Sequence, residues 1–280
     1  MIGFRSKVTT TDILRVLRDA STIKGNDDAF DPNDGTMRQY YITGAFKRVD
    51  GDGTVPEEEL VGLEWTYFNA LQHSDRPART LHWALSKQPK FFVQLLSAVF
   101  VSKDEKDDVL PDDPAALETA RAIAIQALHV LEDWTRVPGS DQGVIDGAAL
   151  KAWVKEARRL CADAGRAEVG DLRIGRVLSA APRNPSETWP PEPVRDVIEL
   201  CRSRDLEEGF QHGLYNRRGV TVRLPTDGGE LERKLAAQYR ADALACFAWP
   251  RTQALLERVA EGYERDAARE DQDAEQRDWR

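Results

Sequence analysis

The sequence predicts an all-α protein of about a dozen helices, arranged as a helical bundle or a short α-solenoid. Apolar residues recur three and four positions apart along most of the chain, which is the spacing of one helix face. Proline and glycine clusters separate these segments. Only residues 219–225 alternate in the β-branched manner of a strand, so we expect at most one short β-hairpin, near 219–225.

The N-terminal part contains five predicted helices. Thr9–Thr11 can cap the first, in which Ile13, Leu14 and Leu17 share a face. We expect a loop over residues 24–35, because this stretch is polar and ends in Asp31-Pro-Asn-Asp-Gly35. The other four helices are expected near residues 37–46, 56–71, 77–85 and 89–100.

The C-terminal part is set off by a charged segment at 103–113. Its helices are expected near residues 117–134, 150–161, 172–181, 193–201, 231–247 and 255–263, with a proline-rich linker at 182–191. We therefore predict an N-terminal helical subdomain at 1–102, a linker at 103–113, a C-terminal helical subdomain at 114–262 and a charged helical extension or tail at 263–280.

The composition excludes several classes of protein. A formal net charge of −9 argues against a general binder of nucleic acid or of acidic membranes, because such proteins need a positive surface. No run approaches the roughly 18 apolar residues of a membrane span, and the N-terminus lacks an apolar signal segment. Cys161, Cys201 and Cys246 are far apart and odd in number, which indicates neither a disulfide framework nor a CxxC metal site. We expect a cytoplasmic protein with no membrane contact and no cofactor.

Two segments share a short pattern. Gly53 to Leu60 and Gly143 to Leu150 both have the frame Gly-x-[Val/Ile]-x4-Leu. In each, a glycine can turn the chain after one helix and an apolar residue can pack at the start of the next. Two such helix–turn–helix units would suit a helical repeat, although three matching positions also arise by chance.

The segment Asp50-Gly-Asp-Gly-Thr-Val-Pro-Glu-Glu-Glu-Leu60 resembles the calcium-binding loop of EF-hands. The spacing places Asp50 and Asp52 at the third and fifth loop positions and Glu59 at the twelfth, where EF-hands use a bidentate glutamate. Arg48 occupies the first position, which removes a ligand and adds a positive charge beside the cation. We therefore expect a turn without metal, and weak calcium binding through Asp50, Asp52 and Glu59 is the alternative.

Catalytic motifs are incomplete throughout the sequence. The Asp50-to-Thr54 stretch also resembles the nucleophile motif of haloacid-dehalogenase-type phosphatases, but residues 44–49 do not form the buried strand that this motif follows. The chain shows no HExxH, GxSxG, P-loop or GxGxxG pattern, and its four histidines are scattered. We assign no catalytic residue, and a non-enzymatic protein is favoured.

One segment concentrates positive charge. Residues 211–226 contain His212, Asn216, Arg217, Arg218 and Arg223 but no acidic residue. Arginine forks suit phosphate and carboxylate groups, so these five side chains are the candidate site for an acidic partner or anion. In the alternative, the arginines pair with carboxylates on neighbouring helices.

Four further segments suggest a relationship. They are Phe91-Phe-Val-Gln-Leu-Leu96, Trp189-Pro-Pro-Glu-Pro-Val-Arg-Asp196, Tyr215-Asn-Arg-Arg-Gly-Val-Thr221 and Trp249-Pro-Arg-Thr252. With them the chain resembles the C-terminal helical region of large, poorly characterised multidomain bacterial proteins. The resemblance implies that this chain is a segment or stand-alone relative of a larger machine that serves bacterial defence. It brings no catalytic residues.

Together these observations predict a non-enzymatic α-helical scaffold that contacts a protein partner through the loop at 216–223. An alternative is a nucleic-acid or nucleotide-associated helical protein that uses Arg217, Arg218 and Arg223. A further alternative is a weak calcium-binding module.

Overall fold

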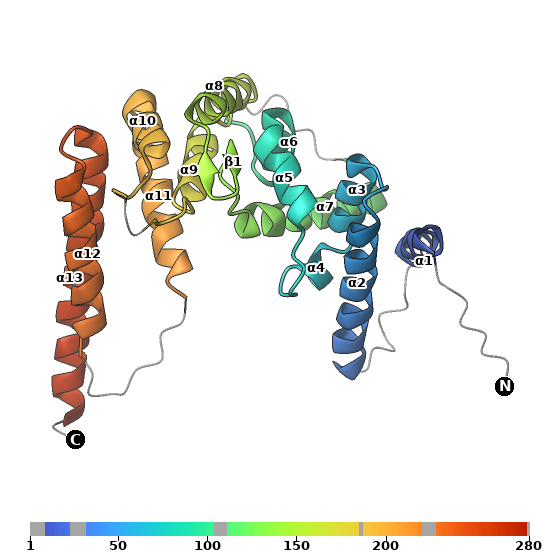
Figure 1. The fold of residues 1–280 in the computed structure, drawn as a ribbon, viewed down its shortest axis with the longest axis horizontal. Helices are drawn as coiled ribbons and strands as arrows, with labels where there is room; N and C mark the ends of the chain where they lie inside the picture. Colours follow the sequence, from blue (N-terminus) through green and yellow to red (C-terminus); the bar gives the residue numbers. More distant parts are fainter. Residues whose placement is uncertain (1–8, 23–31, 104–110, 185–186, 220–227, 279–280) are drawn as a thin grey trace. The chain divides into compact units, whose positions relative to one another are not determined.

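The computed structural model describes residues 9–22, 32–103, 111–184, 187–219 and 228–278. Within these residues the chain forms thirteen helices and one two-stranded sheet, which confirms the all-α prediction (Figure 1). The chain divides into two compact units, Met1–Leu85 and Ser86–Arg280, called here the first and second units. None of the described helices combines the length and the apolar character that crossing a bilayer requires.

The first unit contains the helices nearest the N-terminus. They are α1 (Thr10–Thr22), α2 (Pro32–Asp52), α3 (Glu57–Thr66), α4 (Phe68–Leu71) and α5 (Arg79–Lys87), the last of which ends in the second unit. Phe46, Phe68, Leu71, Leu81 and Leu85 are completely buried and form its core. Because these residues come from α2, α4 and α5, burial of their apolar surface holds the three helices together.

A buried charge cluster adds to this core. Arg76 donates to Asp50 through Nη2 (2.7 Å) and Nε (2.9 Å), and its Nη1 donates to Glu64. Glu64 is fully buried, and its Oε2 accepts the backbone N–H of Leu81 at 2.7 Å. Burial raises the pKa of Glu64, and Arg76 opposes this effect. The guanidinium also lies 4.8 Å from the centroid of the Phe46 ring, so one side chain joins α2, α3 and the segment before α5.

The second unit contains the remaining elements. They are α6 (Pro89–Val99), α7 (Pro114–Asp133), β1 (Ser140–Asp141), β2 (Val144–Ile145), α8 (Gly147–Asp163), α9 (Ala167–Leu178), α10 (Glu192–Cys201), α11 (Arg204–Arg217), α12 (Glu230–Ala245) and α13 (Pro250–Asp278). Side chains of Asp113, Asp146 and Ser203 accept backbone N–H groups at the starts of α7, α8 and α11. These bonds satisfy donors that the first turn of a helix leaves unpaired.

Two helix pairs pack most extensively in the second unit: α9 with α11, and α12 with α13 (Figure 1). Glycines permit the first contact, because a Cβ at Gly209 would lie only 1.9 Å from the carbonyl oxygen of Leu172. Ion pairs of Arg233 with Asp271 and of Arg240 with Glu264, each 2.6 Å long, join α12 to α13.

The structure corrects several details of the sequence prediction. Residues 32–35 belong to α2 rather than to a loop, because proline is well tolerated in the first turn of a helix. The helix expected over 56–71 is broken at Tyr67, which separates α3 from α4. The only hairpin in the described residues lies at 140–145, whereas the 219–225 hairpin falls almost entirely on 220–227, outside the described residues.

The boundary between units also differs from the expected linker at 103–113. Helix α6 packs against α7 and α8, and the Arg166 Nε donates to the Phe100 carbonyl oxygen at 2.7 Å. Residues 86–102 therefore belong with the C-terminal part and not with an N-terminal subdomain at 1–102. At the other end, α13 continues to Asp278, so the charged extension at 263–278 is helical.

The two segments that share the Gly-x-[Val/Ile]-x4-Leu pattern, at Gly53 and Gly143, have only partly similar backbone conformations. Both glycines have a positive φ, 67° and 84°, which explains why glycine occupies these turns. Gly143 lies in the tight turn of the β1–β2 hairpin, whereas Gly53 is not in a hairpin. The structural basis for a repeat is therefore limited to a glycine turn before a helix.

Candidate functional site

A pocket in the second unit contains part of the predicted arginine cluster. Its volume is about 390 Å³, and it lies where the end of α11 meets α12, α13, residues 179–183 and Trp189. Its lining combines three arginines, three aromatic residues and three leucines: Arg183, Arg217, Arg218, Trp189, Tyr239, Tyr263, Leu214, Leu231 and Leu235. This set of residues is called the Arg217 pocket below.

Stacked aromatic rings form one wall of the Arg217 pocket. The Tyr239 and Tyr263 rings are nearly parallel, at 5° and 5.6 Å between centroids. Trp189 lies 6.0 Å from Tyr239, and Tyr215 lies 5.1 Å from Tyr263. Burial raises the pKa of Tyr239, and it raises the pKa of Tyr263 to about 12, so both hydroxyls stay neutral at physiological pH. This wall of the pocket is therefore uncharged.

Two of the three arginines are held by carboxylates and rings. Arg183 Nη1 lies 2.8 Å from Asp242 Oδ2, and its guanidinium lies 4.4 Å from the centroid of the Trp189 ring. Arg218 forms an ion pair with Glu232, which is 1% exposed. The Arg218 guanidinium also lies 5.6 Å from the centroid of the Tyr263 ring. Ring faces attract cations, so these contacts fix both side chains in position. The positive charges of Arg183 and Arg218 are thereby neutralised within the protein.

Arg217 differs from Arg183 and Arg218 in its charge partners. None of the carboxylates in the described part of the chain forms an ion pair with it, and its side chain reaches from an exposed position into the lining of the pocket. Partial burial lowers the pKa of its guanidinium; Tyr239 opposes this shift and Arg176 adds to it. Because a guanidinium stays charged at physiological pH, Arg217 gives the pocket a positive charge that an anion can pair with.

The five side chains proposed from the sequence do not converge. Arg217 and Arg218 line the same pocket, whereas His212 and Asn216 are exposed on α11 and are not part of its lining. The Nε2 atom of His212 lies 3.8 Å from a carboxylate oxygen of Glu208, one turn earlier on α11. Arg223 lies outside the described residues.

Sequence reasoning missed most of the pocket wall. Arg183 and Trp189 lie in the segment that the sequence predicts as a proline-rich linker, and the apolar spacing predicts ordinary helix-face positions for Tyr239 and Tyr263. The linear signal for the first two is an arginine and a tryptophan in an otherwise polar linker. For the two tyrosines no local signal distinguishes a pocket wall from an ordinary core position.

The EF-hand-like residues are not arranged as a metal site. Asp50 pairs with Arg76, Asp52 accepts hydrogen bonds from the hydroxyls of Thr10 and Thr54, and Glu59 pairs with Arg18. In the described residues no group of three or more histidine, cysteine, aspartate or glutamate side chains is placed to hold a metal. The two aspartates end α2, not a strand, which also removes the phosphatase interpretation.

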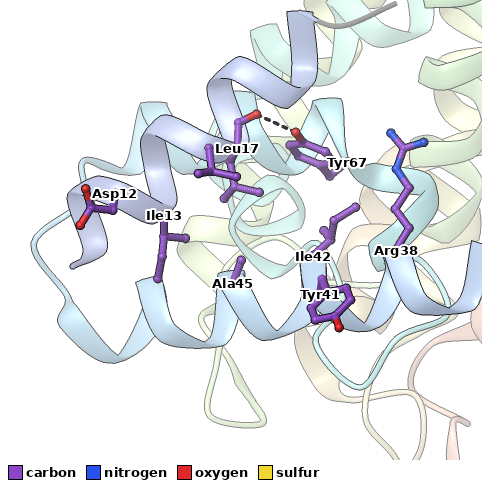
Figure 2. A pocket seen from close by; sticks show the side chains of 9 residues that line it. Asp12, Ile13, Leu17, Arg38, Tyr41, Ile42, Ala45 and Tyr67 are labelled. Atoms are coloured by element: carbon purple, nitrogen blue, oxygen red, sulfur yellow. Dashed lines mark hydrogen bonds between the residues drawn. The ribbon is translucent and has the colours of Figure 1, made fainter. Parts of the chain in front are cut away.

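A second cavity, of about 420 Å³, lies in the first unit between α1 and α2 (Figure 2). Leu17 and Ile42 contribute to its apolar lining, and the Tyr67 hydroxyl donates to the backbone oxygen of Leu17 at 2.6 Å. Asp12 and Arg38 are the charged residues at its edge. This groove is mainly apolar, whereas the Arg217 pocket combines apolar surface with a positive charge that can select a ligand.

Comparisons of the chain with protein-family models, with curated proteins and with solved structures found no significant match.

Proposed function

We propose that the protein is a non-enzymatic α-helical protein-interaction module whose second unit binds an acidic group of a partner protein in the Arg217 pocket. The observation that carries this proposal is the charge of Arg217, which faces an open pocket without a carboxylate partner among the described residues. Arginine at a partly desolvated, aromatic-lined position is typical of residues that dominate binding energy at protein interfaces.

The surrounding helices support the role of a scaffold. The backbones of α9 and α11 lie in contact, and ion pairs hold α12 against α13, so the pocket is built on rigid elements. A preformed site loses little conformational entropy when a partner binds. The resemblance to the helical region of large bacterial proteins adds the proposal that this chain works as part or relative of such a protein. A cytoplasmic location is part of the same proposal.

Association with nucleic acid or nucleotides is the alternative, because tyrosine rings and arginines are also used to bind bases and phosphates. The charge distribution favours a protein partner. Glu232 and Asp242 already neutralise two of the three guanidinium groups, and the whole chain carries a net charge of −9. A phosphate backbone would meet a single available cation in an acidic protein, which is a weak electrostatic attraction.

The test is a charge reversal at Arg217 alone. Arg217→Glu removes the available cation, and Arg121→Glu is the matched control because Arg121 is exposed on α7 with no ion pair in the described residues. Arg218 is not a suitable target, because a glutamate there would face the buried Glu232 and destabilise the fold. Both variants are expected to retain the circular dichroism spectrum and melting temperature of the wild type.

Proteins captured from an extract of the native cell by the wild type and both variants are then quantified by mass spectrometry. We expect specific partners to be lost at least tenfold with Arg217→Glu and retained with Arg121→Glu. An identical partner set for all three chains would refute the proposal. Salt-sensitive binding of RNA or DNA that Arg217→Glu abolishes would instead establish the nucleic-acid alternative.

A further inference from the structure

The charged side chains that line the Arg217 pocket favour a singly charged anion as its ligand. Three guanidinium groups line the pocket, and the carboxylates of Asp242 and Glu232 neutralise two of them. Arg176, which interacts electrostatically with Arg217 but does not line the pocket, shares the Glu132 carboxylate with Arg173, at 2.8 and 3.1 Å. Among the described residues that line the pocket, Arg217 is therefore the guanidinium without a carboxylate partner. A carboxylate matches it, whereas a phosphate group at neutral pH carries up to about two negative charges.

The rest of the pocket favours an apolar group beside this anion. Leu231 is 41% exposed although it lies at the pocket, and Leu214 and Leu235 belong to the same lining. Tyr239 and Tyr263 are 9% and 1% exposed, so they support the pocket from beneath, and the leucines supply the accessible apolar surface. Covering exposed apolar surface with an apolar side chain stabilises a complex by about 25 cal/mol for each Å² removed from water.

The size of the pocket favours one residue over a long segment. A volume of about 390 Å³ is near the lower end of the range of roughly 300–1,000 Å³ that is common for small-ligand sites. In proteins, a carboxylate and an apolar side chain branch from the same carbon only in the last residue of a chain. An internal aspartate or glutamate carries its carboxylate at the tip of its side chain, with polar backbone on both sides.

We infer that the Arg217 pocket binds the C-terminal carboxylate of a partner chain that ends in an apolar residue. The inference rests on the proposed function and specifies its ligand. Arg217 forms the ion pair with the carboxylate, and the leucines, above all the exposed Leu231, contact the terminal side chain. Arg183 and Arg218 stay paired with Asp242 and Glu232 and define the shape of the site.

The test uses two pools of synthetic peptides that are randomised at their last four positions. One pool ends in a free carboxylate and the other in an amide, so the pools differ only in the terminal charge. Each pool is passed over the immobilised full chain as wild type, Arg217→Gln or Arg121→Gln, and retained peptides are identified by mass spectrometry. Wild type and Arg121→Gln are expected to enrich free-acid peptides with leucine, valine or phenylalanine at the end by at least tenfold over Arg217→Gln. The amide pool is expected to show no enrichment.

Equal retention of both pools, or no retention of either, would overturn the C-terminal inference. Enrichment of aspartate or glutamate at internal positions would also overturn it and would point to an internal acidic motif. Competition by N-acetyl-leucine as strong as by the enriched peptides would assign the site to a small carboxylic acid. In each of these cases the proposed function is judged separately, because the loss of partner proteins with Arg217→Glu does not depend on where their acidic group lies.

Discussion

The contact between α9 and α11 predicts that one added methyl group will destabilise the second unit. In Gly209→Ala the new Cβ would lie 1.9 Å from the Leu172 carbonyl oxygen and 2.6 Å from its carbonyl carbon. Carbon–oxygen contacts between packed backbones are normally about 3.3 Å or longer, so the helices must separate by roughly 1.4 Å. No flexible side chain can give way, because the obstacle is the backbone of α9.

The magnitude follows from two opposing effects. Overpacking a well-packed interior costs about 1–3 kcal/mol, and the upper end applies here because two helices must move apart. Replacing glycine by alanine within a helix stabilises it by about 1 kcal/mol. The net expectation for Gly209→Ala is a loss of about 2 kcal/mol in the free energy of unfolding.

Urea unfolding followed by circular dichroism measures this change, with Gly147→Ala as the control. The Cβ at Gly147 would lie 3.5 Å from the Pro193 Cβ, which is an ordinary contact, so the control is expected to change stability by less than about 1 kcal/mol. If Gly209→Ala were as stable as the wild type or more stable, α9 and α11 would not be in backbone contact. That result would refute this description of the second unit.

Two predictions concern the first unit. Arg76→Ala leaves the fully buried Glu64 without its ion pair, so the free energy of unfolding should fall by about 3–5 kcal/mol in chemical denaturation. The control Arg79→Ala, at a 61% exposed position, should lower it by less than about 1 kcal/mol. Equal effects of the two substitutions would contradict the buried charge cluster around Arg76. Burial lowers the pKa of His82 from 6.5 to about 4, so the neutral form is favoured in the folded state. The neutral His82 side chain therefore contributes its full stabilisation above pH 6.5, and up to about 3 kcal/mol of it is lost as the pH falls from 6.5 through 4. Chemical denaturation between these pH values should show a weaker pH dependence of stability in His82→Leu than in the wild type. An unchanged pH dependence would contradict the lowered pKa of His82.

Much of the candidate site depends on contacts that leave no local trace in the sequence. Arg217 and Arg218 are adjacent and chemically identical, yet one is paired with Glu232 and the other has no ion pair in the described residues. The difference arises because α12 places Glu232 beside Arg218, and this contact cannot be predicted from the spacing of residues within α11. The same holds for Tyr239 and Tyr263, whose helical spacing fits a core position and a pocket wall equally well.

The sequence by itself determined the helical character of the chain, several helix starts and the region of the candidate site. These properties follow from neighbours a few residues apart: apolar spacing on α8, capping of α1 by Thr9, and an acid-free stretch that contains Arg217. Only the tertiary structure decided where the first unit ends, which arginine remains available, and which rings surround it. Those outcomes depend on pairings between distant segments, and the energy of such pairings comes from packing and desolvation rather than from local backbone preference.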